Sequence, residues 1–330
     1  MKRLVIATAA IALGFSGHAK SEDVLTATHV FPTSLIYTQS FLEFVDAVNE
    51  RGEGVVRIDV RGGPEAIGMF EQPAAVRDGI VDMVYTPGSF YGGIVAEKDA
   101  LVASNMTGPE ARASGGIDFY NQIHQDKMGV YFLGWMDSGV PFNLWMTEEP
   151  TLDGEGNLDI SGEKVRGNPI FNAFFTDYLG AQVLNLPSTE LYTALQRGTI
   201  TATGWTSIGV MDLSWDDYLK YRVDPAFFST DLGVLVNLDS WNRLSDESKA
   251  ILQEVAIEHE AASAAKLQAR IAEEFAELEK RGLEVVTLEG DAAESYVTAA
   301  RETTWNRMRE QMEAQGTMDN YDRMIELFNK

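Results

Sequence analysis

The amino-acid sequence predicts an α/β fold in which two similar lobes are joined by a long helix. Three observations carry this prediction. Strands and helices alternate in the first part of the chain, a helix–glycine–strand pattern occurs once in each half, and one long helical segment has no internal Gly or Pro.

The alternation begins with residues 23–31, DVLTATHVF, which read as a strand because apolar and polar side chains roughly alternate. Residues 32–52 carry apolar side chains at helical spacing and predict a helix that closes at a glycine. Residues 55–63 alternate again, and a short helix and a strand are predicted at 73–79 and 80–86. This order of elements is typical of an α/β sandwich.

The repeated pattern joins residues 71–83, EQPAAVRDGIVDM, to residues 190–202, ELYTALQRGTITA. Each segment predicts a helix that ends at a glycine, Gly79 or Gly198, and leads into a strand. Because helix–glycine–strand units are common, a chance match is the alternative. We favour duplicated lobes, since the chain is long enough for two and the match falls in its two halves.

The long helix is predicted from Ser245 to Gly282, with Ser245 as its N-cap. One helix of this length measures about 55 Å, which exceeds the width of a small lobe, so it could cross both lobes and tie them together. The alternative is a coiled-coil arm, which is disfavoured because strict apolar heptads are not sustained.

The N-terminal sequence MKRLVIATAAIALGFSGHAK has a basic start, a short apolar run and small residues before Ala19, which predicts a signal peptide over residues 1–19. A membrane anchor is the alternative, but the apolar run is shorter than the ~20 residues of a spanning helix. The chain has no Cys, which argues against a lipid anchor, disulfides and thiolate metal sites. We therefore expect a soluble protein exported to the periplasm.

The formal charge of −24 argues against nucleic acid and anionic lipid as partners. His29, His124 and His259 are scattered, so no metal site or other cofactor is expected. The chain lacks the G-x-S-x-G elbow of serine hydrolases and the Gly-Lys-Ser/Thr of a phosphate loop. No catalytic set is therefore evident.

A binding site is the better interpretation. Aromatic residues cluster where strands are expected to end, and although most of these would be core, some could line a ligand cleft between the lobes. Arg166 stands in GEKVRGNPIFNAFF, between a polar lead-in and an apolar stretch. A guanidinium is the natural partner of a carboxylate, because it can donate two parallel hydrogen bonds.

The segment ISGEKVRGNP, followed by LGAQVLNLPSTELYTALQRGTITA, resembles the signature region of the solute receptors of TRAP (tripartite ATP-independent periplasmic) transporters, of the dicarboxylate-receptor-like family. That family has Gly-x-Lys-x-Arg, then Gly-Ala before a strand, then Glu-x-Tyr-x-Ala-Leu-Gln-x-Gly. The lead-in HVFPTS, the segment AVRDGIVDM and the helix start LSDESKAIL also fit, so the resemblance covers essentially the whole chain after the signal peptide.

The resemblance implies a non-enzymatic receptor with a periplasmic-binding-protein-like α/β fold: two lobes joined by hinge strands and a lobe-spanning helix. Such a receptor closes over an organic acid and delivers it to small and large integral membrane subunits driven by an ion gradient. The family's motif arginine pairs with the ligand carboxylate, and Arg166 matches it.

Two departures from the family pattern bear on the ligand. Thr201 and Ala202 replace the usual Asp-Gly, and Trp205 falls where a ligand-contacting Asn is usual. Many members also have a second arginine in the hinge region, where this chain has Phe142 and Asn143. These changes argue against a sugar acid and favour an aromatic carboxylate or a 2-oxo acid; a metal bridges the carboxylate in some members, but no ligand set for one is evident.

The predicted ligand-binding residues are Arg166, Trp205, Asn143, Phe142, Ser188, Thr86, Phe31, Glu71 and Asn168. The first lobe is expected to comprise residues 24–141 and 231–270, and the second 142–230 and 271–330. We expect a monomer, with a dimer as the alternative. A secreted hydrolase and a structural periplasmic protein or adhesin are the rival functions.

Overall fold

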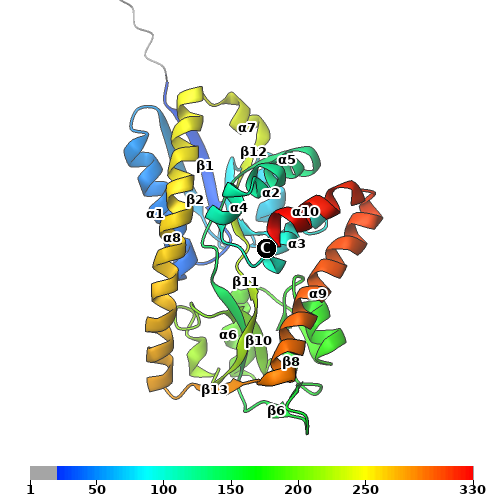
Figure 1. Cartoon of the computed structure of the whole chain (residues 1–330). Helices are drawn as coiled ribbons and strands as arrows, with labels where there is room; N and C mark the ends of the chain where they lie inside the picture. The colour runs from blue at the N-terminus through cyan, green and yellow to red at the C-terminus, as the bar shows by residue number, and fades with distance from the viewer. Residues whose placement is uncertain (1–20, 330) are drawn as a thin grey trace, which may run out of the picture.

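The computed structural model describes residues 21–329, and these residues form two β-sheets with helices packed around each (Figure 1). The predicted signal peptide, residues 1–19, lies outside the described residues. The two sheets are the centres of two lobes, so the predicted two-lobed α/β fold is confirmed.

The first lobe is built on a five-stranded sheet. Its elements are β1 Asp23–His29, α1 Ile36–Arg51, β2 Val56–Gly62, α2 Gln72–Arg77, β3 Met83–Pro87, the 3₁₀ turns η1 Gly88–Phe90 and η2 Ala96–Lys98, α3 Asp99–Ala103, α4 Gly108–Ala113, α5 Gly116–Met128, β4 Val130–Trp135, β12 Leu232–Asn237 and α7 Leu238–Arg243. The strand order is β2-β1-β3-β12-β4. β1 is parallel to β2 and β3, whereas β12 is antiparallel to β3 and β4.

The second lobe is built on a six-stranded sheet. Its elements are β5 Pro141–Met146, the hairpin strands β6 Thr151–Leu152 and β7 Leu158–Asp159, β8 Lys164–Gly167, the π-helical turn η3 Phe174–Tyr178, β9 Gln182–Asn185, α6 Ser188–Gln196, β10 Ala202–Thr206, the 3₁₀ turn η4 Trp215–Asp217, β11 Tyr221–Ser229 and β13 Glu284–Thr287. The strand order is β13-β11-β5-β10-β8-β9. β8 is parallel to both of its neighbours, and β5 is antiparallel to both of its own.

The helix–glycine–strand pattern is confirmed in both lobes. α2 is followed by Gly79 with φ 72° and leads to β3, and α6 is followed by Gly198 with φ 63° and leads to β10. Both glycines adopt the left-handed conformation that commonly ends helices. The two lobes therefore use the same local device at equivalent points of the sequence pattern.

Two short segments carry the chain between the sheets: residues 136–140 join β4 to β5, and residues 230–231 join β11 to β12. They are bonded to each other, since Thr230 donates its N–H to the Val140 carbonyl (3.0 Å) and its hydroxyl to the Asp137 carbonyl (2.5 Å). The crossing segments therefore form one narrow connection. Because hinges between lobes consist of a few loop residues, this connection is the expected position of the hinge.

The long helix α8, Asp246–Lys280, has 35 residues and is about 52 Å long. It begins as predicted, with the Ser245 side chain accepting a hydrogen bond from Ser248 N (3.2 Å). Figure 1 shows α8 running along one side of the molecule past both sheets, so the predicted lobe-spanning helix is confirmed.

Two buried glutamates fix α8 to the two lobes. On the first lobe, Glu260 accepts hydrogen bonds from Trp135 N (2.8 Å) and Arg112 Nε (2.7 Å). On the second, Glu274 accepts from Gly209 N (2.8 Å). Burial raises the pKa of both carboxyls. About 21 Å of helix axis separates these two attachments, so α8 acts as a brace across the hinge.

The C-terminal elements are α9 Gly290–Gln315, the 3₁₀ turn η5 Met318–Asn320 and α10 Tyr321–Phe328. α9 contacts β11 of the second lobe and α3 of the first, and α10 packs on α3 and α5 of the first lobe. The predicted division placed residues 271–330 in the second lobe. Because α10 contacts α3 and α5, the proposed division moves α10 to the first lobe, and the other boundaries stay a proposal.

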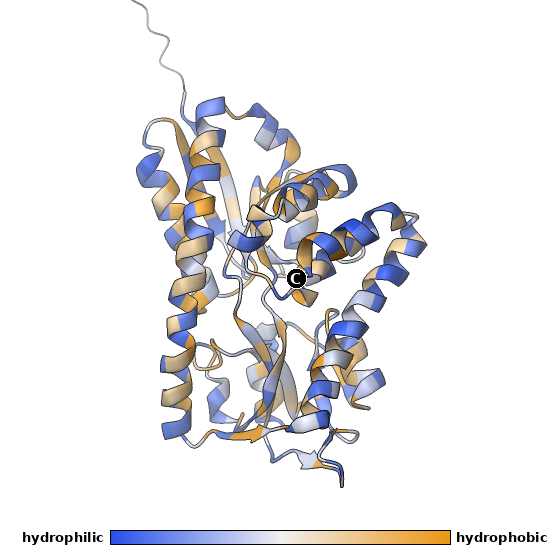
Figure 2. Cartoon of the chain, viewed as in Figure 1, coloured by the Kyte–Doolittle hydropathy of each residue, from blue (hydrophilic) through white to orange (hydrophobic). Residues whose placement is uncertain are grey.

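Hydropathy follows this arrangement (Figure 2). The helices are banded in hydrophobic and hydrophilic residues, as expected when one face packs on a sheet and the other meets solvent. Within residues 21–329, no helix combines the length and the apolarity that crossing a membrane requires.

The brace generates a stability prediction. Glu260→Gln should lower the free energy of unfolding by about 1–3 kcal/mol, because half-buried Arg112 would lose its charged partner. Glu258→Gln is the matched control on the same helix, since the side chain of Glu258 is 63% exposed where it pairs with Arg51, and it should change stability little. Urea unfolding followed by circular dichroism measures both, and equal midpoints for the two variants would contradict the bracing role of Glu260.

Candidate ligand-binding site

A cavity lies between the two lobes, against the crossing segments. The empty volume of the cavity, including the part open to solvent, is about 560 Å³. The volume within which the centre of a water molecule can move is smaller, about 40 Å³. That is room for a few waters, so the site suits a small molecule. Its aromatic lining is Phe31, Tyr37, Phe90, Phe142, Trp205 and Phe228, and its polar lining includes Ser89, Arg166, Asn168, Thr206, Thr230 and Asp231.

Arg166 reaches this cavity from an inner strand of the second sheet. It lies on β8, opposite Leu184 of β9 and Thr203 of β10. β8 continues for one more residue, Gly167, where a side chain is excluded because a Cβ would lie 2.3 Å from Val183 Cγ1. The sequence Arg-Gly-Asn-Pro therefore places Arg166 at the edge of the sheet that faces the first lobe.

The guanidinium of Arg166 is buried without a carboxylate partner among the described residues. The residue is 2% exposed, and its Nε donates to the Leu186 carbonyl (3.0 Å). Burial alone lowers its pKa to about 10, so the group is still charged at neutral pH. The buried or half-buried arginines Arg112, Arg222 and Arg307, in contrast, each pair with a carboxylate. Arg166 is therefore a buried cation that lines the cavity without a counter-ion among residues 21–329.

Trp205 forms the wall beside this cation. Its indole lies 5.9 Å from the Arg166 guanidinium carbon, within the range of a cation–π contact. Its ring packs edge-on against Trp215, with centroids 4.7 Å apart, and against Phe31 of the first lobe at 6.0 Å. The aromatic wall is thus shared by both lobes and holds the guanidinium against one side of the cavity.

Short polar side chains complete the lining. Asn168 follows β8 and turns the chain, with its Oδ1 accepting from Ile170 N (3.1 Å). Ser89 donates its N–H to Asp231 Oδ2 (3.1 Å). Within residues 21–329, no group of three or more His, Cys, Asp or Glu side chains is placed to hold a metal ion.

The structure brings together five of the nine predicted site residues: Arg166, Trp205, Phe142, Phe31 and Asn168 all line the cavity. Asn143 does not line the cavity. It lies opposite Trp205 on the paired strand, and its side chain donates to the Val223 carbonyl (3.1 Å) and to Asp224 Oδ1 (2.7 Å). Asn143 therefore shares the face of the sheet with Trp205, but these hydrogen bonds direct its amide to Asp224, and it is absent from the cavity lining.

The other three predicted residues also lie outside the lining of the cavity. Thr86 is buried and donates its hydroxyl to the Pro87 carbonyl (3.3 Å). Ser188 is buried at the start of α6, and Glu71 is exposed just before α2. None of these three predictions is supported by the arrangement of the described residues.

Sequence reasoning missed several lining residues, among them Tyr37, Ser89, Phe228 and Asp231. Phe90 had a usable signal, since it is one of the aromatic residues that follow the predicted strand 80–86. The residues around Asp231 had none, because their place beside the cavity follows from the crossing of β11 to β12 and not from a local pattern.

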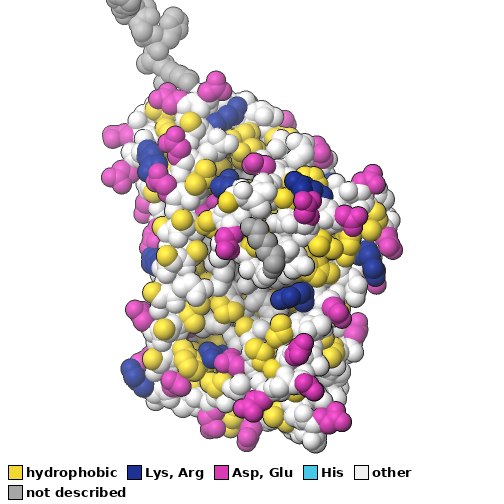
Figure 3. Space-filling view, viewed as in Figure 1, with side chains coloured by type: hydrophobic (Ala, Val, Ile, Leu, Met, Phe, Trp, Pro, Cys, Tyr) yellow, Lys and Arg dark blue, Asp and Glu magenta, His cyan; other side chains and the backbone are white. Residues whose placement is uncertain are grey.

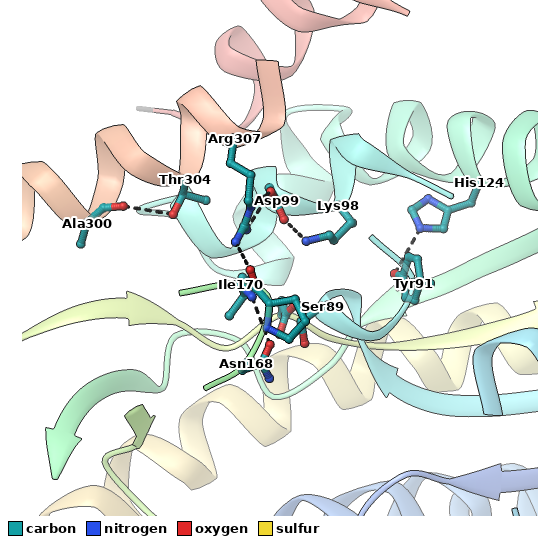
Figure 4. Close-up of polar contacts among 12 residues, drawn as sticks. Ser89, Tyr91, Lys98, Asp99, His124, Asn168, Ile170, Ala300, Thr304 and Arg307 are labelled. Atoms are coloured by element: carbon teal, nitrogen blue, oxygen red, sulfur yellow. Dashed lines mark hydrogen bonds and ion pairs between the residues drawn. The ribbon is translucent and has the colours of Figure 1, made fainter. Parts of the chain in front are cut away.

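The rim of the cavity is tied to both lobes by α9 (Figure 4). Arg307 of α9 donates from Nε to Asp99 Oδ2 of the first lobe (2.8 Å) and from Nη1 to the Pro169 carbonyl of the second. The neighbours of Pro169, Asn168 and Ile170, both line the cavity. α9 therefore positions the segment that closes the site beside Arg166.

The outer surface would not attract an anion. On the face shown in Figure 3, Asp and Glu side chains are spread over both lobes and Lys and Arg are fewer, in keeping with the formal charge of −24. An acid that enters the cavity must therefore be held by local positive charge, and Arg166 supplies it.

Comparison with known proteins agrees with this arrangement. The model of a family described as bacterial extracellular solute-binding protein, family 7, matches residues 155–311, which include Arg166 and Trp205. A solute-binding protein of Albidiferax ferrireducens is 23% identical over 313 residues, covering 90% of this chain and 90% of that protein. A monocarboxylate 2-oxoacid-binding periplasmic protein of Nostoc is 34% identical over 105 residues, covering 30% of this chain and 28% of that protein.

Two solved structures share the fold. DctP7 of Bordetella pertussis, an extracytoplasmic solute receptor binding pyroglutamic acid, has a TM-score of 0.76 at 19% identity and covers 91% of this chain and 99% of its own. A TRAP transporter solute-binding protein of Bordetella bronchiseptica, with copurified calcium and picolinate in its active site, has a TM-score of 0.77 at 18% identity and covers 93% of each chain. Residues 155–311, which include the strands that carry Arg166 and Trp205, thus match solute-binding protein family 7, and the chain has the fold of these two solute receptors.

Proposed function

We propose that this receptor captures a small organic acid between its lobes, pairs the acid's carboxylate with Arg166, and delivers it to TRAP membrane subunits for ion-gradient-driven uptake. One observation carries the proposal: a charged guanidinium, 2% exposed, faces an interlobe cavity and has no carboxylate partner among the described residues.

The physical argument rests on desolvation. Burying a cation that has one hydrogen bond is unfavourable unless an anion lies beside it. Arg112, Arg222 and Arg307 each have a carboxylate partner, whereas Arg166 lines the cavity without one. A carboxylate that enters would accept two parallel hydrogen bonds from the fork in a water-poor site. The ligand therefore completes a charge pair of which the protein supplies one half.

The body of the ligand meets an aromatic wall. Phe31, Phe142, Trp205 and Phe228 leave a narrow space that suits a flat or compact acid of few atoms. An aromatic carboxylate or a 2-oxo acid fits this description. The Nostoc relative binds 2-oxo monocarboxylates and the Bordetella bronchiseptica protein was solved with picolinate, which supports the same two classes.

The family consists of receptors and not enzymes, which removes the secreted hydrolase as a rival. Its members work outside the cytoplasm, in line with the signal peptide predicted over residues 1–19. The proposal gives the first lobe residues 24–141 and 231–270 together with α10, and the second lobe residues 142–230 and the segment from 271 to the end of α9.

The first test concerns the carboxylate anchor. Arg166→Ala should weaken binding of the tightest acid from a panel of 2-oxo and aromatic monocarboxylates by about 2–5 kcal/mol, which is about thirty-fold to several thousand-fold in Kd. Arg166→Lys should recover only part of this, because an ammonium lacks the two-pronged fork. Isothermal titration calorimetry measures both.

The matched control for these variants is Arg222→Lys. Arg222 is a buried arginine of the same sheet, but it is already paired with Asp224 (2.9 Å) and does not line the cavity. Its variant should bind the acid as the wild type does. Full-affinity binding by a folded Arg166→Ala protein would refute the carboxylate assignment.

The second test concerns the wall. Trp205→Ala should cost about 1–3 kcal/mol of binding energy, because the ligand body would lose its aromatic neighbour. Trp205→Asn should shift preference from aromatic acids toward hydroxylated ones, since an amide can donate to and accept from hydroxyl groups. Competition assays between benzoate and gluconate would show the shift, and an unchanged ratio would contradict a contact between Trp205 and the ligand.

Closure is the third test. Because lining residues come from both lobes and from the crossing segments, a ligand gains its full set of contacts only when the lobes are together. Small-angle X-ray scattering should give a smaller radius of gyration with saturating ligand than without it. An identical radius in a sample shown by calorimetry to be saturated would speak against ligand-driven closure.

A further inference from the structure

Asp231 is a second unmatched charge in the same cavity. It lies where β11 crosses to β12, is 5% exposed, and lines the cavity together with Arg166. Its side chain accepts one hydrogen bond among the described residues, from Ser89 N to Oδ2 (3.1 Å). An ionised carboxylate can accept about four, so most of its hydrogen-bonding capacity is unused.

The nearby charges do not neutralise Asp231. The charge of Lys98 stabilises the ionised form of Asp231, but the Lys98 ammonium is in direct contact with Asp99. Asp99 in turn pairs with Arg307 (2.7 Å), and Figure 4 shows Lys98, Asp99 and Arg307 in a row to one side of Ser89 and Asn168. Burial raises the pKa of Asp231 to about 6, with Lys98 acting in the opposite direction. At neutral pH the carboxylate is therefore largely ionised.

The cavity thus presents a cation and an anion that do not pair with each other. Arg166 comes from the end of β8 in the second lobe, and Asp231 comes from the crossing segment. Each is buried with one hydrogen bond, and burying a charge without a partner is unfavourable. An anion without a hydrogen-bond donor would pair with Arg166 but would be repelled by Asp231. A ligand with a carboxylate and a hydrogen-bond donor would pair with Arg166 and donate to Asp231.

We propose that Asp231 is a specificity-determining residue, which accepts a hydrogen bond from an N–H group of the bound acid. The preferred ligand then carries its carboxylate toward Arg166 and an N–H, such as that of an amine, a lactam or a pyrrole-type ring, toward Asp231. This rests on the proposed function, in which Arg166 holds the carboxylate, and it narrows the ligand class to small acids that bear nitrogen.

The experiment compares pyrrole-2-carboxylate with 2-furoate. Both are flat five-membered rings with one carboxylate, and they differ in that a ring N–H of the first is a ring oxygen in the second. A carboxylate facing the ring oxygen would be left unpaired and repelled, so the wild-type protein should bind pyrrole-2-carboxylate about ten-fold or more tightly. Calorimetry or competition against a fluorescent probe gives the ratio of the two Kd values.

Asp231→Asn is the decisive variant. It keeps the size of the side chain and an oxygen that can accept from Ser89 N, but the charge is lost. The ratio between the two acids should fall to within about three-fold, mainly because 2-furoate binds better once the repulsion is gone. Asp82→Asn is the control: Asp82 also accepts a hydrogen bond from a backbone N–H, that of Thr26 (2.8 Å), and it does not line the cavity. This variant should keep the wild-type ratio.

The outcomes separate the two proposals. Equal binding of both acids by the wild type, or a preference for 2-furoate, would overturn the role of Asp231 while leaving that of Arg166 intact. A ratio that persists in Asp231→Asn would overturn it as well. If Arg166→Ala leaves the binding of both acids unchanged, or if no monocarboxylate of the panel binds, the proposed function fails and the inference fails with it.

Discussion

The unpaired charge of Arg166 is the constraint on which the rest of the site depends. Its guanidinium is buried, charged at neutral pH and held by one backbone carbonyl, while Trp205 fixes its position from the side. Such a group is tolerated when a folded structure gains something from it, because desolvating a cation without an anion is unfavourable. In the proposed function, the gain is a strong and directional interaction with a ligand carboxylate that the acidic outer surface would repel.

The connections between the two lobes allow a movement that would expose the Arg166 charge to solvent or bury it. The two sheets are joined at one narrow connection, where Thr230 is bonded to the other crossing segment, and α8 is fastened to each lobe by a buried glutamate. On the opposite side, Arg307 of α9 bonds both lobes at the rim of the cavity. A connection of this kind allows the lobes to move about the hinge while each remains rigid.

Much of this could be predicted from the sequence. Alternating apolar patterns, the glycines after α2 and α6, and the uninterrupted run of α8 are local signals, and local signals determine elements well. Arg166 and Trp205 could be found because they lie in or beside a motif that resembles a known family. Asn143 could not be placed, since its side chain is directed by a hydrogen bond to Asp224, which lies 81 residues later and comes close only in the folded sheet. Asp231 was missed for a related reason: only the folded chain brings the crossing segment against the end of β8.

The central claim is that Arg166 is the anchor of the ligand carboxylate, and a crystal structure of the complex tests it most directly. The protein should be crystallised with the tightest-binding acid of the monocarboxylate panel. The account predicts that both oxygens of one ligand carboxylate lie about 2.7–2.9 Å from nitrogens of the Arg166 guanidinium, with the body of the acid against Trp205. A ligand bound elsewhere, or one whose carboxylate points away from Arg166, would contradict the account.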